Sequence, residues 1–70
     1  MSVWGARKSR VVLSALLRIG WQLKRQAGSP KVLSRDGSLD FVFALHDGEE
    51  IGPRMLSRIA RQTGLRPEDL

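Results

Sequence analysis

The chain has 70 residues, of which 12 are Lys or Arg and 7 are Asp or Glu, so its formal net charge is +5. This length has room for one small domain with a thin core, and 41% apolar and 27% charged residues indicate a folded rather than a disordered protein. Cys is absent and there is one His, which excludes a disulfide framework and thiolate zinc sites, so we expect no metal and no cofactor.

The first predicted element is an amphipathic helix over residues 7–19, which Gly20 ends. Its apolar run is far shorter than the ~20 residues of a membrane span, and no small-residue cleavage site follows it. We therefore expect no span, no signal peptide and a cytoplasmic protein. Residues 1–6 are expected to form a loose arm, in which Trp4 either packs over the sheet edge or serves as a docking or RNA-stacking group. The helix has apolar residues at Val12, Leu13, Leu16, Leu17 and Ile19 and polar ones at Arg10, Ser14 and Arg18.

Three short strands joined by tight turns are predicted in the middle of the chain. In the first, Trp21 and Leu23 alternate with polar neighbours, as on a half-buried strand. The Asp36-Gly37 pair favours a hairpin turn with positive φ before the third strand. That strand is the most β-like stretch, with Phe41 and Phe43 on one face. The expected bounds are 21–26, 31–34 and 39–45 for the strands, and 27–30 and 35–38 for the turns.

An acidic loop over residues 46–51 leads into a second predicted helix. Pro53 suits the first helical position because the amide it lacks would have no partner there. Gly64 followed by Leu65 predicts a left-handed cap, and Pro67 prevents continuation. The acidic side chains of the loop suit the positive end of the helix dipole, which is a structural role. These acids are Asp47, Glu49 and Glu50, and the expected buried stripe is Met55, Leu56, Ile59 and Ala60.

Arg54, Arg58 and Arg61 recur at i, i+4 and i+7, so they form a row along one exposed face of the second helix. The first interpretation is an ordinary solvated face. The same row is also consistent with a phosphate-binding site or with a docking site for an acidic partner.

The element order is α-β-β-β-α, and both helices are expected to bury their stripes on one face of the sheet. The sequence therefore predicts an α+β fold, a two-layer sandwich that forms one domain over residues 1–70.

The charge is divided unevenly along the chain. Residues 1–35 carry eight Lys or Arg and no acid, whereas residues 36–70 carry four Arg and seven acids. A strongly basic half is typical of a nucleic-acid binder, because each neutralised phosphate releases condensed counterions. A solvated surface that keeps a small domain soluble is the alternative.

Six short motifs occur in a fixed order and spacing. They are Ile19-Gly20-Trp21, Lys24-Arg25-Gln26, Gly28-Ser29, Phe43-Ala44-Leu45-His46, residues 50–56 and residues 59–65. Together they resemble the HicA family of small toxins, also called YcfA-like mRNA interferases, over residues 10–70. The resemblance implies a fold like that of a double-stranded RNA-binding domain. It also implies an RNA-cleaving toxin of a type II toxin–antitoxin pair, neutralised by a HicB-like antitoxin.

The chain departs from the family at the active residue. In the family a His follows the Gly-Ser turn, at the start of the second strand, and here that position is Pro30. Metal-free RNA cleavage needs a group that titrates near neutral pH to take the 2′-hydroxyl proton, and Pro has none. Pro also lacks the backbone N–H that a phosphate or a strand partner would bind.

Three functions stay open. In the first, a degenerate homologue binds RNA or antitoxin but cleaves poorly or not at all. In the second, His46, which matches a family histidine at the end of the third strand, cleaves RNA beside Lys31 as the phosphate-stabilising cation. A His at a strand end is more often an ordinary surface residue. In the third, the chain is a non-catalytic protein-interaction module that binds an acidic partner.

The residues expected to bind RNA lie around the first two strands and near the first helix. A-form RNA is recognised mainly by shape, 2′-hydroxyl and phosphate, so sequence preference should be mild. An antitoxin covering the same face would neutralise by occlusion, and the thin core leaves room for stabilisation by a partner or a homodimer. The set is Lys24, Arg25, Gly28, Ser29 and Lys31, with Arg7, Lys8 and Arg10 as outer phosphate contacts.

Overall fold

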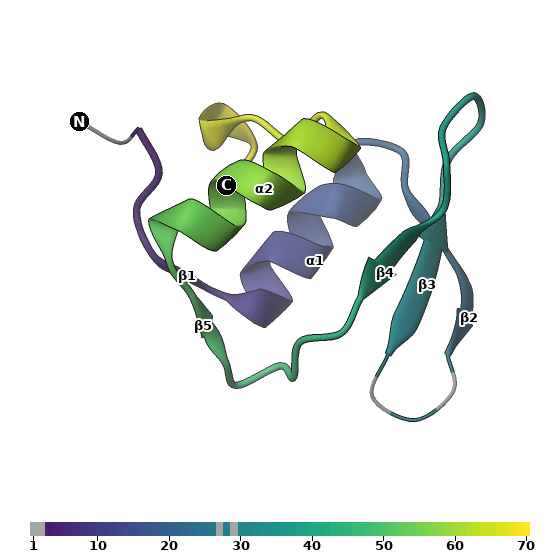
Figure 1. Cartoon of the computed structure of the whole chain (residues 1–70), viewed down its shortest axis with the longest axis horizontal. Coiled ribbons are helices and arrows are strands. Elements are labelled where there is room, and N and C mark those ends of the chain that lie inside the picture. The colour runs from purple at the N-terminus through teal and green to yellow at the C-terminus, as the bar shows by residue number, and fades with distance from the viewer. Residues whose placement is uncertain (1–2, 27, 29) are drawn as a thin grey trace.

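The computed structural model describes residues 3–26, 28 and 30–70, which form two helices, a three-stranded antiparallel sheet and a separate pair of short strands (Figure 1). The predicted α+β order is confirmed, with β1, β5 and a final 3₁₀ turn as additions. The bounds are β1 Arg7–Lys8, α1 Ser9–Arg18, β2 Gln22–Gln26, β3 Lys31–Ser34, β4 Phe41–Phe43, β5 Glu50–Ile51, α2 Pro53–Thr63 and η1 Pro67–Asp69.

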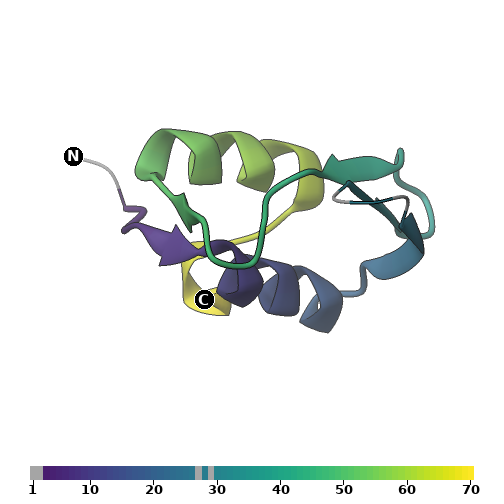
Figure 2. The ribbon, with the colours of Figure 1, turned by 90° about the horizontal axis from the view of Figure 1, so that it is seen from below.

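The two helices lie side by side on the same side of the three-stranded sheet (Figures 1 and 2). β1 directly precedes α1 and β5 directly precedes α2, and these two strands pair antiparallel, with Arg7 opposite Ile51. Both helices therefore begin at the same strand pair and run towards the sheet. The sequence analysis did not predict β1 and β5, because a two-residue strand has no periodic pattern of its own.

The sheet has the order β2-β3-β4, so β3 is central. Phe43 is 2% exposed and Val42 is 57% exposed, which confirms the predicted alternation on β4. One prediction for β2 is wrong: Leu23 was expected on the buried side of the strand, but it is 52% exposed. Its partner in the register, Leu33, is fully buried. β2 is an edge strand, farthest from the helices in Figure 1, and the pairing shifts between Leu23 and Arg25.

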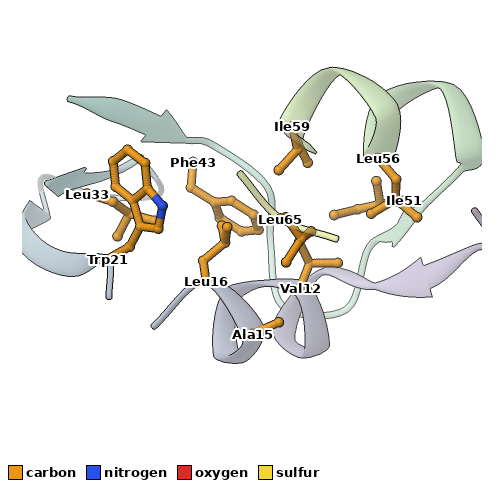
Figure 3. Packing of buried hydrophobic residues seen from close by; sticks show 10 residues of the cluster. All are labelled: Val12, Ala15, Leu16, Trp21, Leu33, Phe43, Ile51, Leu56, Ile59 and Leu65. Carbon is orange, nitrogen blue, oxygen red and sulfur yellow. The ribbon is translucent and has the colours of Figure 1, made fainter. Parts of the chain in front are cut away.

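Trp21 joins the sheet side of the core to the end of α2. It is 1% exposed, and its Nε1–H donates a hydrogen bond to the carbonyl oxygen of Thr63 at 3.0 Å. The ring meets Phe41 edge-on with 6.2 Å between centroids, and the guanidinium of Arg35 lies 4.8 Å from the ring centroid. Figure 3 shows the cluster running from Trp21 to the two helices. Its members are Val12, Ala15, Leu16, Trp21, Leu33, Phe43, Ile51, Leu56, Ile59 and Leu65.

The buried stripes of the helices are narrower than predicted. Leu17 of α1 and Met55 of α2 are 46% and 43% exposed, because each helix has one covered side and one side open to solvent. Gly64 has φ 79° and caps α2 in the left-handed conformation, as predicted. Trp4, in the arm predicted to be loose, is half-buried and packs against the core. Among the described residues, no helix has the length and apolar character needed to cross a membrane.

Candidate functional site

His46 belongs to a tight turn that is tied to the start of α1. The carbonyl oxygen of His46 accepts hydrogen bonds from the backbone N–H of Glu49, at 3.0 Å, and from the hydroxyl of Ser9. The backbone N–H of His46 donates to the Glu49 carboxylate at 3.1 Å, so this carboxylate stabilises the turn, and no side chain caps α2. The backbone N–H of Ser9 also donates to the Glu49 carbonyl at 2.8 Å. These bonds hold the backbone of His46 in place.

The side chain of His46 is exposed, and within the described part of the chain its imidazole has no hydrogen-bond or ion-pair partner. It lies at an open hollow that Lys31 also lines. Lys31, the first residue of β3, is opposite Phe43, the last residue of β4, so it lies where the chain leaves the sheet towards His46. The antiparallel register thus brings together a cation and an imidazole that are distant in sequence.

The rest of this hollow is lined by the β2–β3 turn and the residues beside His46. Gly28 is exposed with φ 73°, and its carbonyl oxygen accepts a hydrogen bond from the side-chain amide of Gln26 at 3.2 Å. Leu45 and Asp47 line the other side. We call the space lined by Gln26, Gly28, Lys31, Leu45, His46 and Asp47 the Lys31–His46 hollow.

The sequence analysis missed Gln26 and Asp47 as members of this hollow. Gln26 lies opposite Lys31 in the register, and only the pairing of the strands reveals this. Asp47 adds a negative charge to the lining of the hollow and so weakens the attraction of the hollow for a phosphate. Within the described ranges no three His, Cys, Asp or Glu side chains are grouped as a metal site would require.

The predicted cations of the first two strands do not share one face. Arg25 lies opposite Val32, whereas Lys31 lies opposite Phe43, and neighbouring residues of a strand point to opposite faces. Lys24 forms an ion pair with Asp40 at 2.7 Å, with both side chains about half exposed. Arg25 and Lys31 therefore lie on opposite faces of the sheet, because the bulge in β2 and the strand register separate them.

The remaining basic residues that were predicted to contact RNA lie outside the hollow. Arg7 and Lys8 form β1 and Arg10 lies in the first turn of α1, all exposed and on the side of the molecule away from the sheet (Figure 1). Ser29 lies outside the described residues. Pro30 is exposed and directly precedes β3, between two residues that line the Lys31–His46 hollow.

Replacing Ser9 by Ala should destabilise the chain by about 1 kcal/mol, because it deletes a hydrogen bond from a fully buried hydroxyl to the turn of His46. Urea denaturation followed by circular dichroism measures this change. Ser14→Ala is the matched control, since Ser14 is exposed on the same helix and Ala is the better helix former. Equal free energies of unfolding for the two variants would contradict the role of Ser9.

Comparison with curated proteins and with solved structures gives no match. The family model described as the HicA toxin of bacterial toxin–antitoxin systems matches residues 9–65. This range runs from the first residue of α1 to Leu65 beyond α2, and it contains Pro30 and the whole Lys31–His46 hollow. The match covers most of the chain and agrees with the observed order of helices and strands, so this protein belongs to the HicA family of toxins, which work with an antitoxin partner.

Proposed function

We propose that the chain is an RNA-binding toxin of the mRNA interferase type, in which RNA binds at the Lys31–His46 hollow and cleavage is slow or lost. The observation that carries this proposal is that Lys31 and His46 line one hollow in a member of a toxin family. Since mRNA is the substrate, the activity belongs to the cytoplasm. A HicB-like antitoxin that covers the hollow would neutralise the toxin by occlusion.

The reaction that the hollow supports is transfer of the RNA phosphoryl group from the 5′-oxygen to the neighbouring 2′-oxygen. The ammonium group of Lys31 binds a phosphate oxygen and stabilises the charge that develops on it. The imidazole of His46 takes the proton of the 2′-hydroxyl while the 2′-oxygen attacks phosphorus, and the bond from phosphorus to the 5′-oxygen breaks. A 2′,3′-cyclic phosphate results, and the 5′-oxygen leaves as a hydroxyl after it takes a proton from water.

Pro30 is the reason for expecting slow cleavage. The leaving 5′-oxygen needs a proton, and Pro30 carries no group that donates one. His46 is the one histidine of the chain, so no second imidazole assists it. Binding does not require proton transfer, and the hollow retains its cation, so RNA binding is expected to persist.

The other residues predicted to contact RNA are scattered over the surface, and each of them contributes separately to phosphate binding. Arg25 and Lys24 lie on the edge strand, Gly28 lines the hollow itself, and the basic residues near α1 add distant phosphate contacts. Because these cations lie on different faces, one RNA strand reaches few of them at a time. We therefore propose modest affinity that comes mostly from phosphates. The distant contacts are Arg7, Lys8 and Arg10.

RNA affinity should fall steeply with salt. For three to four phosphate contacts, the affinity for single-stranded RNA is expected to fall about 20- to 50-fold between about 50 and 200 mM salt. Fluorescence anisotropy with a labelled single-stranded RNA in the presence of a chelator measures this. Lys31→Gln should weaken binding and make the salt dependence shallower, because it removes one phosphate contact.

Arg66→Gln is the matched control for Lys31→Gln. It also removes one positive charge, but Arg66 lies near the 3₁₀ turn, where its guanidinium is 3.7 Å from the Glu68 carboxylate and 3.8 Å from that of Asp69. It should leave the salt dependence unchanged. A flat salt response of the unmodified chain, or an equal loss in both variants, would count against RNA binding at this hollow.

A further inference from the structure

The row of arginines on α2 has no ion-pair partner among the residues that the structure describes. Arg54, Arg58 and Arg61 are all exposed, and the ion pairs among the described residues involve other cations. Together with Pro53, Met55 and Ser57, they line a second open hollow, on the surface of the helix. We call this surface the α2 arginine face. It shares no residue with the Lys31–His46 hollow.

Helix geometry gives this face a regular spacing of charge. Residues at i, i+4 and i+7 lie on one side of a helix, with steps of about 6 and 4.5 Å along its axis. The buried residues Leu56 and Ile59 face the core (Figure 3), and the exposed arginines lie on the opposite side of the helix by its 3.6-residue period. Three like charges at this spacing repel each other, and carboxylates placed opposite them would relieve that repulsion.

Met55 adds an apolar component to the same surface. Its side chain is 43% exposed and lines the hollow together with the guanidinium groups. Arg and Met are both enriched in protein–protein interfaces, and the unbranched thioether of Met adapts to the shape of an apolar partner. A phosphate backbone makes use of cations but not of an exposed thioether, so the combination favours a protein over RNA on this face.

We propose that the α2 arginine face binds an acidic segment of a partner protein, with carboxylates on the three guanidinium groups and an apolar side chain on Met55. This interaction is additional to RNA binding at the Lys31–His46 hollow. The two surfaces have no residue in common, so a segment bound only on α2 does not contact the lining of that hollow. Failure of one proposal therefore leaves the other intact.

The test is an NMR titration of the whole chain with a synthetic peptide of about 15 residues, long enough to form some helix. The peptide carries three Glu at i, i+4 and i+7 and Leu residues beside them, and a scrambled peptide of the same composition is its control. We expect amide shifts centred on residues 53–61, and weaker binding of the scrambled peptide. Met55→Ser should reduce the affinity further, because it removes the apolar contact.

Two triple variants separate this face from a general charge effect. Replacing Arg54, Arg58 and Arg61 by Gln should weaken peptide binding about tenfold, because three exposed ion pairs are lost. Replacing Lys8, Arg10 and Arg25 by Gln removes the same charge elsewhere and should weaken binding less than about threefold, since salt screens distant charges. The same spectra show whether each variant remains folded.

Two results would overturn the proposal. One is an equal loss of peptide affinity in both triple variants, or shifts that lie mainly outside α2, which would show attraction by net charge alone. The other is a titration in which single-stranded RNA shifts residues 53–61 more strongly than the peptide does. That result would make the α2 arginine face a phosphate-binding surface instead.

Discussion

Trp21→Ala is expected to remove a large part of the free energy of unfolding of the chain. Truncating a large buried aromatic side chain typically costs about 3–5 kcal/mol, and a chain of this length has a total stability of roughly 4–10 kcal/mol. Trp21 is 1% exposed and is the residue where the sheet, the end of α2 and Arg35 meet. Its loss also leaves the Thr63 carbonyl without the indole donor.

Thermal melting followed by circular dichroism measures the effect of Trp21→Ala. Leu39→Ala is the control, because Leu39 is 91% exposed and should change stability by less than about 0.5 kcal/mol. Trp21→Phe separates the two contributions, since it keeps most of the apolar surface but removes the N–H donor, and it should fall between the other two. A melting temperature for Trp21→Ala equal to that of the unmodified chain would refute the central place of this side chain in the core.

Pro30→His is expected to raise the rate of RNA cleavage by about 10²- to 10⁴-fold, the usual contribution of one positioned proton-transfer group. Residue 30 directly precedes Lys31 and lies beside the Lys31–His46 hollow, so an imidazole there reaches the same substrate phosphate. With His46 it would complete a pair in which one ring accepts the 2′-hydroxyl proton and the other donates to the leaving oxygen. A time course with end-labelled RNA in the presence of a chelator measures the rate.

Two further variants test this explanation. Pro30→Ala restores the backbone N–H without an imidazole and should not accelerate cleavage. Pro30→His combined with His46→Ala should lose most of the gain, because the second ring is missing. Should Pro30→His cleave no faster than Pro30→Ala, the missing imidazole is not what limits this chain. Cleavage that is rapid in the unmodified chain and lost in His46→Ala would show instead that His46 suffices alone.

Several elements followed from local sequence. Pro53 begins α2 and Gly64 ends it in the left-handed conformation, and Gly37 has the positive φ that its turn requires. On β4 the alternation of Phe43 with Val42 predicted which side faces the core. These features depend on residues that are neighbours in the chain, on capping, turn geometry and the period of a strand.

The candidate site could be predicted only in part. His46 and Lys31 were identified from the sequence, and the register places both at one hollow. Lys31 and Arg25 were both predicted to bind RNA, and only the strand register shows that they lie on different faces of the sheet. The hydrogen bond from the Ser9 hydroxyl to the His46 carbonyl joins residues that are 37 positions apart, and no local sequence pattern predicts such a contact.

The sequence by itself determined the order of the two helices and of the three strands between them, the charge asymmetry, the position of the one histidine and the replacement at Pro30. Only the tertiary structure decided which charges lie together, that β1 pairs with β5, and that Leu23 is exposed on an edge strand. Helix periodicity and turns arise between near neighbours, whereas strand register and edge position depend on contacts between distant segments. The spatial grouping of these cations therefore follows from folding and cannot be obtained by counting them along the chain.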